Sequence, residues 1–185
     1  LTNSVFAINY TTDDQNTWED ANWTPSGVPG AGDNVTLLPG AEIEIDQDQF
    51  CADLTLSDDG SSIVLIINEG NILTVSDDFK VRDTDNDSNI EIYLDGTLLI
   101  GDDFDLTTTT ANSGATWIIE ISNTGLLDIN GTGSLDTEFQ IQQSGATGTI
   151  TCEGTIDTRA DFYNQALNGG NIIIDIIDAG KIIAD

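Results

Sequence analysis

The sequence predicts an all-β protein that folds as a single-domain parallel β-helix (β-solenoid) with an N-terminal cap. Apolar and polar residues alternate along short segments, a glycine-centred strand pattern recurs about every 25 residues, and a Trp- and Pro-rich segment precedes the repeats. No stretch keeps a helical spacing of apolar residues beyond two turns. We therefore expect about five to six coils, with residues 1–33 as N-terminal strand and cap and residues 34–185 as the β-helix.

Residues 1–33 differ in composition from the rest of the chain. An alternating pattern over Val5 to Tyr10 predicts one strand, and Trp18 and Trp23 follow it among prolines and glycines. The first coil of a solenoid otherwise exposes the end of its core and its unpaired strand edges. We expect this segment to cover that end.

The repeats have the order strand, glycine turn, strand, acidic corner. The two clearest copies run over 63–79, centred on Gly70, and over 90–104, centred on Gly96; looser copies centre on Gly125, Gly154 and Gly180. One such coil cannot bury its apolar side alone, but coils stacked at roughly 4.8 Å bury a continuous column. A β-sandwich of short strands would show the same alternation, yet it gives no reason for the recurring glycines.

Aromatic residues recur at equivalent positions of the predicted coils. Phe79 and Phe104 both follow an Asp-Asp pair, so we expect their rings to stack directly, and Phe50 and Phe162 are candidates to extend that ladder. Trp117 occupies an inward strand position. We expect it in the core rather than on the surface as a sugar-stacking platform.

The chain has two cysteines, Cys51 and Cys152. They are about four coils apart, roughly 19 Å along the stack. A disulfide needs Cα atoms within about 7 Å, so we expect two separate buried thiols.

The segment 171–185 is among the most apolar of the chain. We expect either that the solenoid continues in a longer chain or that another subunit covers this end. Self-association into a homo-oligomer or a head-to-tail filament is the partner interaction that this pattern favours. The candidate assembly residues are Val5, Phe6, Ile8 and Tyr10 of the first strand, with Ile182 and Ile183 of the last coil.

The capping segment also carries a motif in the order Trp18, Asn22-Trp23, Gly27-Val28-Pro29 and Gly32-Asp33-Asn34-Val35. It resembles the opening of secreted bacterial surface proteins that continue as parallel β-helices. Such proteins are mostly adhesins, cell-surface structural proteins or carbohydrate-active enzymes. The resemblance implies the fold and an extracellular location more than any one activity.

Charge excludes several functions. The chain carries 33 Asp and Glu against 4 Lys and Arg, a formal net charge of −29, and it has no histidine. Nucleic acids and anionic membranes need clustered basic residues, which this chain lacks. Without histidine, Ser-His-Asp and Cys-His catalysis and ordinary zinc sites are excluded. A charge of this size fits a medium rich in salt or divalent cations, so we expect an extracellular or cell-surface protein, although a halophile's cytosol would select a similar composition.

Calcium is the one cofactor that the acidic residues suggest. Oxygen ligands alternate in one segment at Asp83, Asp85, Asp87, Asn89 and Glu91. Such spacing suits a hard cation that takes six to eight oxygens. An EF-hand does not fit, because Ser88 replaces the sixth-position glycine and Leu94 the final glutamate. The alternative is a solvated loop between coils.

Stacked acidic corners form a second calcium candidate, made of Asp77, Asp78, Asp102 and Asp103. Carboxylates about 5 Å apart repel each other, and a bound cation would turn this repulsion into attraction. Lys80 and Arg82 follow the first pair and are the alternative source of neutralisation.

We do not expect an enzyme. Paired carboxylates can hydrolyse glycosides, but among so many acids close pairs arise by chance. The leading hypothesis is an extracellular structural or adhesive β-solenoid. One alternative is a carbohydrate-binding or carbohydrate-active module that contacts a surface polysaccharide, for which an aromatic and acidic groove on one outer face would be diagnostic. Another is a calcium-stabilised spacer of a larger adhesin.

Overall fold

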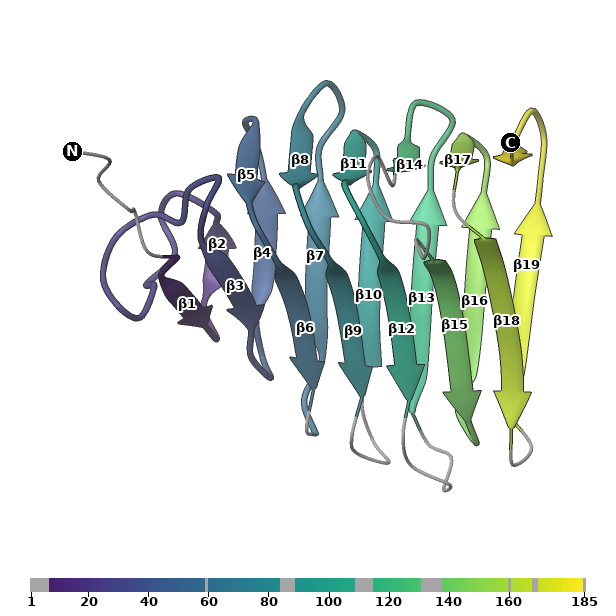
Figure 1. Ribbon diagram of the computed structural model, residues 1–185, viewed down its shortest axis with the longest axis horizontal. Helices are drawn as coiled ribbons and strands as arrows, with labels where there is room; N and C mark the ends of the chain where they lie inside the picture. The colour runs from purple at the N-terminus through teal and green to yellow at the C-terminus, as the bar shows by residue number, and fades with distance from the viewer. Residues whose placement is uncertain are drawn as a thin grey trace.

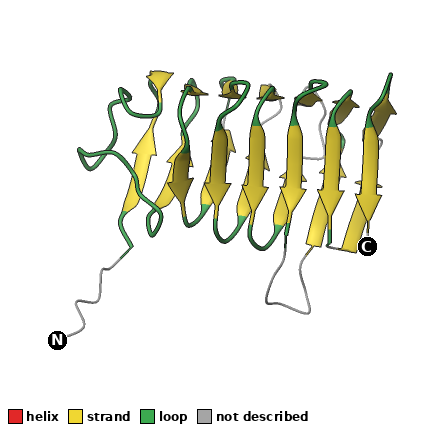
Figure 2. Cartoon of the chain, turned by 90° about the horizontal axis from the view of Figure 1, so that it is seen from above, coloured by secondary structure: helices red, strands yellow, loops and turns green. Residues whose placement is uncertain are grey.

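The computed structural model describes residues 7–58, 60–83, 89–108, 115–130, 138–159, 161–167 and 170–184. Its coils stack into a β-solenoid of about six turns with about 26 residues per turn (Figures 1 and 2). Neighbouring coils pair in parallel throughout the described strands. Within these ranges there is no helix long and apolar enough to cross a membrane. The predicted parallel β-helix is confirmed.

Three sheets form the sides of the solenoid. Sheet A contains β1 (Asn9–Thr12), β3 (Asn34–Leu37), β6 (Leu54–Asp58), β9 (Phe79–Asp83), β12 (Phe104–Thr108), β15 (Glu138–Ser144) and β18 (Asp161–Leu167). Sheet B contains β2 (Gln15–Thr17), β4 (Glu42–Ile45), β7 (Ile63–Ile67), β10 (Asn89–Leu94), β13 (Thr116–Ile121), β16 (Thr147–Cys152) and β19 (Asn171–Ile176). Sheet C contains β5 (Gln49–Cys51), β8 (Ile72–Val75), β11 (Thr97–Ile100), β14 (Leu126–Ile129), β17 (Thr155–Thr158) and β20 (Lys181–Ala184).

The alternation seen in the sequence decides which side chains enter the column. In β7, Ile63, Leu65 and Ile67 point inward and are fully buried, whereas Val64 and Ile66 are partly exposed on the outside. β-Branched residues suit both positions of such a pleated strand. The buried side chains form one continuous core from the first coils to β17.

Phenylalanines line the inside of sheet A. The rings of Phe79 and Phe104 stack with centroids 5.2 Å apart and planes 12° apart, as predicted. Phe139 continues the row edge-on, and the backbone register pairs Phe139 with Phe162. The prediction for Phe50 is wrong, because Phe50 lies on the outer face of sheet C, paired with Thr74, and is 47% exposed. Trp117 is buried in β13, as expected.

The recurring glycines lie at the turn between sheets B and C, where successive coils approach closely. A Cβ on Gly125 would lie 2.0 Å from the carbonyl oxygen of Leu94, and one on Gly154 would lie 2.2 Å from that of Gly125. Only glycine fits such contacts. Gly70 is not part of this row. Because the register pairs Ile72 with Thr97, the residue level with Gly96 is Asn71. Gly70 has a positive φ of 82°, which its turn requires.

The N-terminal segment both starts the solenoid and covers its end. β1 and β2 are the first strands of sheets A and B. Trp18 is fully buried and Trp23 nearly so, with the Trp23 Nε1–H donating to the Trp18 carbonyl at 2.8 Å. Thr11 pairs antiparallel with Thr24, which covers the outer edge of β1.

The candidate assembly residues of the first strand are placed differently from one another. Tyr10 is buried in β1 and its ring meets Trp23 edge-on at 6.5 Å. Ile8 is 43% exposed. Val5 and Phe6 lie outside the described residues.

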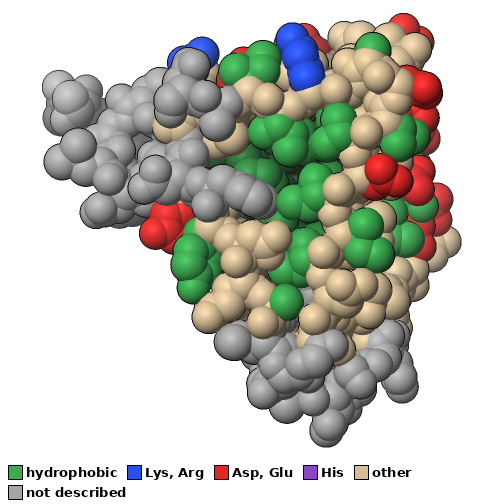
Figure 3. Space-filling view, turned by 90° about the vertical axis from the view of Figure 1, so that its right-hand side faces the viewer, with side chains coloured by type: hydrophobic (Ala, Val, Ile, Leu, Met, Phe, Trp, Pro, Cys, Tyr) green, Lys and Arg blue, Asp and Glu red, His purple; other side chains and the backbone are tan. Residues whose placement is uncertain are grey.

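The C-terminal coil exposes apolar side chains. Ile172 and Ile174 pack against the core, but Ile173, Ile176 and Ile182 are 45%, 39% and 47% exposed. Ile183 is partly exposed on β20. Figure 3, which looks onto this end, shows apolar side chains gathered over it.

Cys51 and Cys152 are both free and buried, in sheets C and B respectively. Burial raises the pKa of both thiols, with the Asp53 carboxylate adding to the effect at Cys51. The prediction of two separate buried thiols is confirmed.

Candidate functional site

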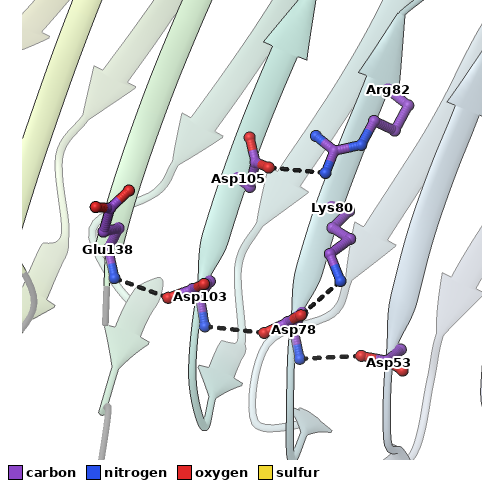
Figure 4. A network of polar contacts seen from close by, with 7 residues as sticks. All are labelled: Asp53, Asp78, Lys80, Arg82, Asp103, Asp105 and Glu138. Carbon is purple, nitrogen blue, oxygen red and sulfur yellow. Dashed lines mark hydrogen bonds and ion pairs between the residues drawn. The ribbon is translucent and has the colours of Figure 1, made fainter. Parts of the chain in front are cut away.

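An acidic row follows the corner at which the chain turns from sheet C into sheet A. Asp53, Asp78 and Asp103 each directly precede a paired residue of β6, β9 and β12, and Glu138 opens β15 (Figure 4). The in-register pairing of Leu54, Phe79 and Phe104 therefore stacks these acids one coil above the next. This arrangement puts several negative charges into one line.

Each aspartate in this row accepts a hydrogen bond from the backbone of the next coil. Asp53 Oδ1 accepts from the Asp78 N–H at 3.3 Å, and Asp78 Oδ1 accepts from the Asp103 N–H at 3.4 Å. Asp103 Oδ1 accepts from the Glu138 N–H at 2.8 Å. The first two bonds are long and the third is of ordinary length. The carboxylates thus link successive coils as well as carrying charge.

Two of the four basic residues lie beside this row. Lys80 Nζ is 2.5 Å from Asp78 Oδ2, and Arg82 Nη2 is 2.7 Å from Asp105 Oδ2 of the next coil. The alternative to calcium, neutralisation by basic side chains, is therefore realised at Asp78 by Lys80, whereas Arg82 reaches Asp105 (Figure 4). All four side chains are partly exposed, so each ion pair contributes at most about 1 kcal/mol.

The charges around the corner shift several pKa values. Burial, and then the carboxylates of Asp78, Asp53 and Asp102, raise the pKa of Asp77. Burial raises the pKa of Asp103 as well, against the hydrogen bond from Glu138. At Asp105, burial also acts upward, but the hydrogen bonds from Arg82 and Thr107 outweigh it and lower the pKa. The ionised carboxylate is therefore disfavoured at Asp77 and Asp103, first by burial and then by the neighbouring negative charges.

Burial alone would lower the pKa of Lys80. The hydrogen bond to Asp78 and the charges of Asp78 and Asp53 outweigh it, so the pKa is raised. The Lys80 ammonium is thus held in its charged form by the acidic row.

The side chains of Asp53, Asp77 and Asp78 come close enough to share one cation. Each can place a carboxylate oxygen within 4.8 Å of the others. Calcium prefers such oxygens, but it takes six to eight of them, and one oxygen each of Asp53 and Asp78 already accepts a backbone hydrogen bond. Asp102 and Asp103 lie one coil further on and are not part of this group among the described residues.

Sequence reasoning missed Asp53 because no Asp-Asp-Phe pattern marks it. The residue after it is Leu54, which occupies the position of Phe79 in the previous coil. The register of sheet A shows that Asp53 is equivalent to Asp78. In the sequence, the signal for this equivalence is an aspartate followed by an apolar residue, Leu54, at the start of an alternating segment.

The residues of the other calcium candidate, the segment from Asp83 to Glu91, are spread over two strands and the residues between them. Asp83 ends β9 and Asn89 begins β10, while Asp85 and Asp87 lie outside the described residues. Glu91 is on the outer face of sheet B and accepts hydrogen bonds from Asn89 Nδ2 and the Tyr93 hydroxyl, both at 2.5 Å. The hydrogen bond from the Tyr93 hydroxyl to Glu91 is the main cause that raises the pKa of Tyr93 to about 12.

Comparison with family models, curated proteins and solved structures gives no match to this chain. The function must therefore be argued from the geometry of the solenoid itself.

Proposed function

We propose that the protein is a non-enzymatic structural or adhesive element of an extracellular surface or filament. The observation that carries this proposal is the unbroken column of buried side chains that runs through the stacked coils. With strands about 4.8 Å apart, six intervals give a column roughly 29 Å long. Because every coil hydrogen-bonds to the next along three sides, the column resists bending, which suits a spacer.

The acidic exterior supports the extracellular part of the proposal. A net charge of −29 keeps separate columns apart and repels acidic polymers. The stacked carboxylates at the sheet C to sheet A corner repel each other less where salt or divalent cations are abundant. Calcium held by Asp53, Asp77 and Asp78 is part of this proposal, as a stabiliser of the stack rather than as a reactive centre.

Assembly along the axis is the mechanism that we propose for building a larger structure. At one end Ile173, Ile176 and Ile182 are exposed, and in the N-terminal segment at the other end Ile8 and Val28 are 43% and 47% exposed. A contact between these unlike ends is heterologous, so it propagates as a filament unless it closes into a ring.

The test compares two substitutions that add the same charge at equally exposed apolar positions. Ile182→Asp changes the C-terminal end of the column, and Phe50→Asp changes the outward-facing surface of β5, the first strand of sheet C, with both wild-type residues 47% exposed. Sedimentation velocity over a range of concentrations should show self-association of the wild type and of Phe50→Asp, and its loss in Ile182→Asp. A wild type that stays monomeric at all concentrations would exclude axial assembly.

A further inference from the structure

A groove runs over the corner between sheets B and C, at the carboxyl ends of the sheet B strands. Its volume is about 390 Å³, and its lining includes Ile66, Tyr93, Asp95, Glu120, Thr151 and Glu153. A second hollow of about 300 Å³ adjoins it over β2 and β4 and shares Ile66. The outer face of sheet B is thus hollowed over several coils.

The groove repeats with the coils. The register pairs Tyr93 with Glu120 and Glu120 with Thr151, and these three side chains form one outer row. Asp95 and Glu153 come two residues after members of this row, in the turns that follow β10 and β16. A ligand in the groove would therefore lie along the stack and meet a new set of side chains about every 4.8 Å.

The chemistry of the lining is both acidic and apolar. Asp95, Glu120 and Glu153 contribute carboxylates, and none of the described residues that line the groove is Lys or Arg. Ile66 and the ring of Tyr93 supply an apolar surface, and the hydrogen bond to Glu91 at 2.5 Å fixes the ring.

We infer that this groove binds a linear amino-sugar polymer, with its ammonium groups against Asp95, Glu120 and Glu153 and its ring faces against Ile66 and Tyr93. An acidic polysaccharide would be repelled, and a fully neutral one would leave the carboxylates without a charged partner. A simple cation would not use the apolar surface. An amino sugar uses both, because it carries an amine, hydroxyls and a C–H face that packs on an aromatic ring.

This inference goes beyond the proposed structural role and does not depend on assembly. It gives the column a lateral adhesive surface, whereas assembly uses the two ends.

The test is calorimetric titration of the whole chain at pH 5.5 and low salt, where amines are protonated and carboxylates ionised. The probes are a glucosamine tetramer, its fully N-acetylated counterpart and spermidine, a triamine without sugar rings. We expect the tetramer to bind at least tenfold more tightly than either of the other two. Equal binding of the N-acetylated tetramer would overturn the role of the amines, and equal binding of spermidine would overturn the role of the sugar rings.

Three variants test the location, and their melting curves verify that each is folded. Glu120→Gln should weaken tetramer binding about tenfold, since hydrogen bonds to charged groups are the strong ones. Tyr93→Ala should weaken it about fivefold. Asp157→Asn removes the same charge as Glu120→Gln but lies on sheet C, so it should leave binding unchanged. If Glu120→Gln and Asp157→Asn behaved alike, the groove would not be the binding site.

Discussion

The indole ring of Trp117 lies directly over Gly148 of the next coil. The two residues are paired in β13 and β16, and a Cβ on Gly148 would lie 1.8 Å from Cε2 of Trp117. Trp117 is only 2% exposed, so its ring is packed within the core. The absence of a side chain at Gly148 therefore leaves the space that the indole ring of Trp117, in the neighbouring coil, occupies.

Gly148→Ala should lower the free energy of unfolding by about 1–3 kcal/mol, the usual cost of overpacking a core. Urea denaturation followed by tryptophan fluorescence measures this. Gly32→Ala is the control, because a Cβ at Gly32 meets no atom within 4 Å. Equal stability of the two variants would show that Trp117 does not pack on Gly148.

Removing a ring from the phenylalanine row should be among the most destabilising changes. Phe104 touches both Phe79 and Phe139, with centroids at 5.2 and 5.0 Å, and it is 1% exposed. Phe104→Ala should cost about 3–5 kcal/mol by the same urea experiment. Phe50→Ala, at the exposed position on sheet C, should change stability by no more than about 0.5 kcal/mol. A small effect at Phe104 would contradict a continuous column.

Neutralising Asp77 at the corner and Asp105 in the adjoining strand β12 should change stability in opposite directions. The pKa of Asp77 is raised above 3.8, so its folded-state contribution is unfavourable once the carboxyl ionises. Asp77→Asn should therefore raise the melting temperature at pH 7, and this gain should vanish as the pH falls below 3.8.

The pKa of Asp105 is lowered below 3.8, so it stabilises the fold above that pH and the stabilisation is lost as the pH falls. Asp105→Asn should lower the melting temperature at pH 7, and this loss should shrink as the pH falls below 3.8. Circular dichroism melts at low ionic strength give both values. The same sign for the two variants at pH 7 would refute the assignment of Arg82 to Asp105.

Calcium should raise the melting temperature through the corner group. Millimolar CaCl₂ should stabilise the wild type beyond NaCl of equal ionic strength, because general screening acts equally in both salts. Asp53→Asn should abolish the calcium-specific part, and Asp157→Asn, on sheet C, should preserve it. If the two salts raised the melting temperature of the wild type equally, calcium binding at this corner would be contradicted. Lys80 and the backbone N–H groups would then be the groups that neutralise its carboxylates.

The sequence predicted the parts of the fold that depend on residues repeated at nearly equal spacing. Phe79 and Phe104 were recognisable because both follow the same acidic pair one coil apart. Asp53 could not be recognised because Leu54, and not a phenylalanine, follows it. Phe139 could not be recognised because its coil is longer than the one between Phe79 and Phe104. The match of Trp117 with Gly148 could not be predicted, since it requires the register between two strands.

The placement of Phe50 shows the same limit. Alternation fixes which residues share a face of one strand, but not to which sheet a short strand belongs. β5 has only three residues, and its pairing with β8 rather than with a strand of sheet A turns Phe50 outward. Similarly, the groove beside Tyr93 arises from side chains of four successive coils, including residues in the turns after three of their strands, which no single segment reveals.

Electron microscopy of the purified chain, with and without calcium, tests the central proposal most directly. A structural element that assembles along its axis should form filaments of constant width, one column across, that lengthen with protein concentration. Filaments should be absent for Ile182→Asp and retained for Phe50→Asp. Isolated particles at every concentration, or lateral sheets that both variants form equally, would contradict assembly through the ends of the solenoid.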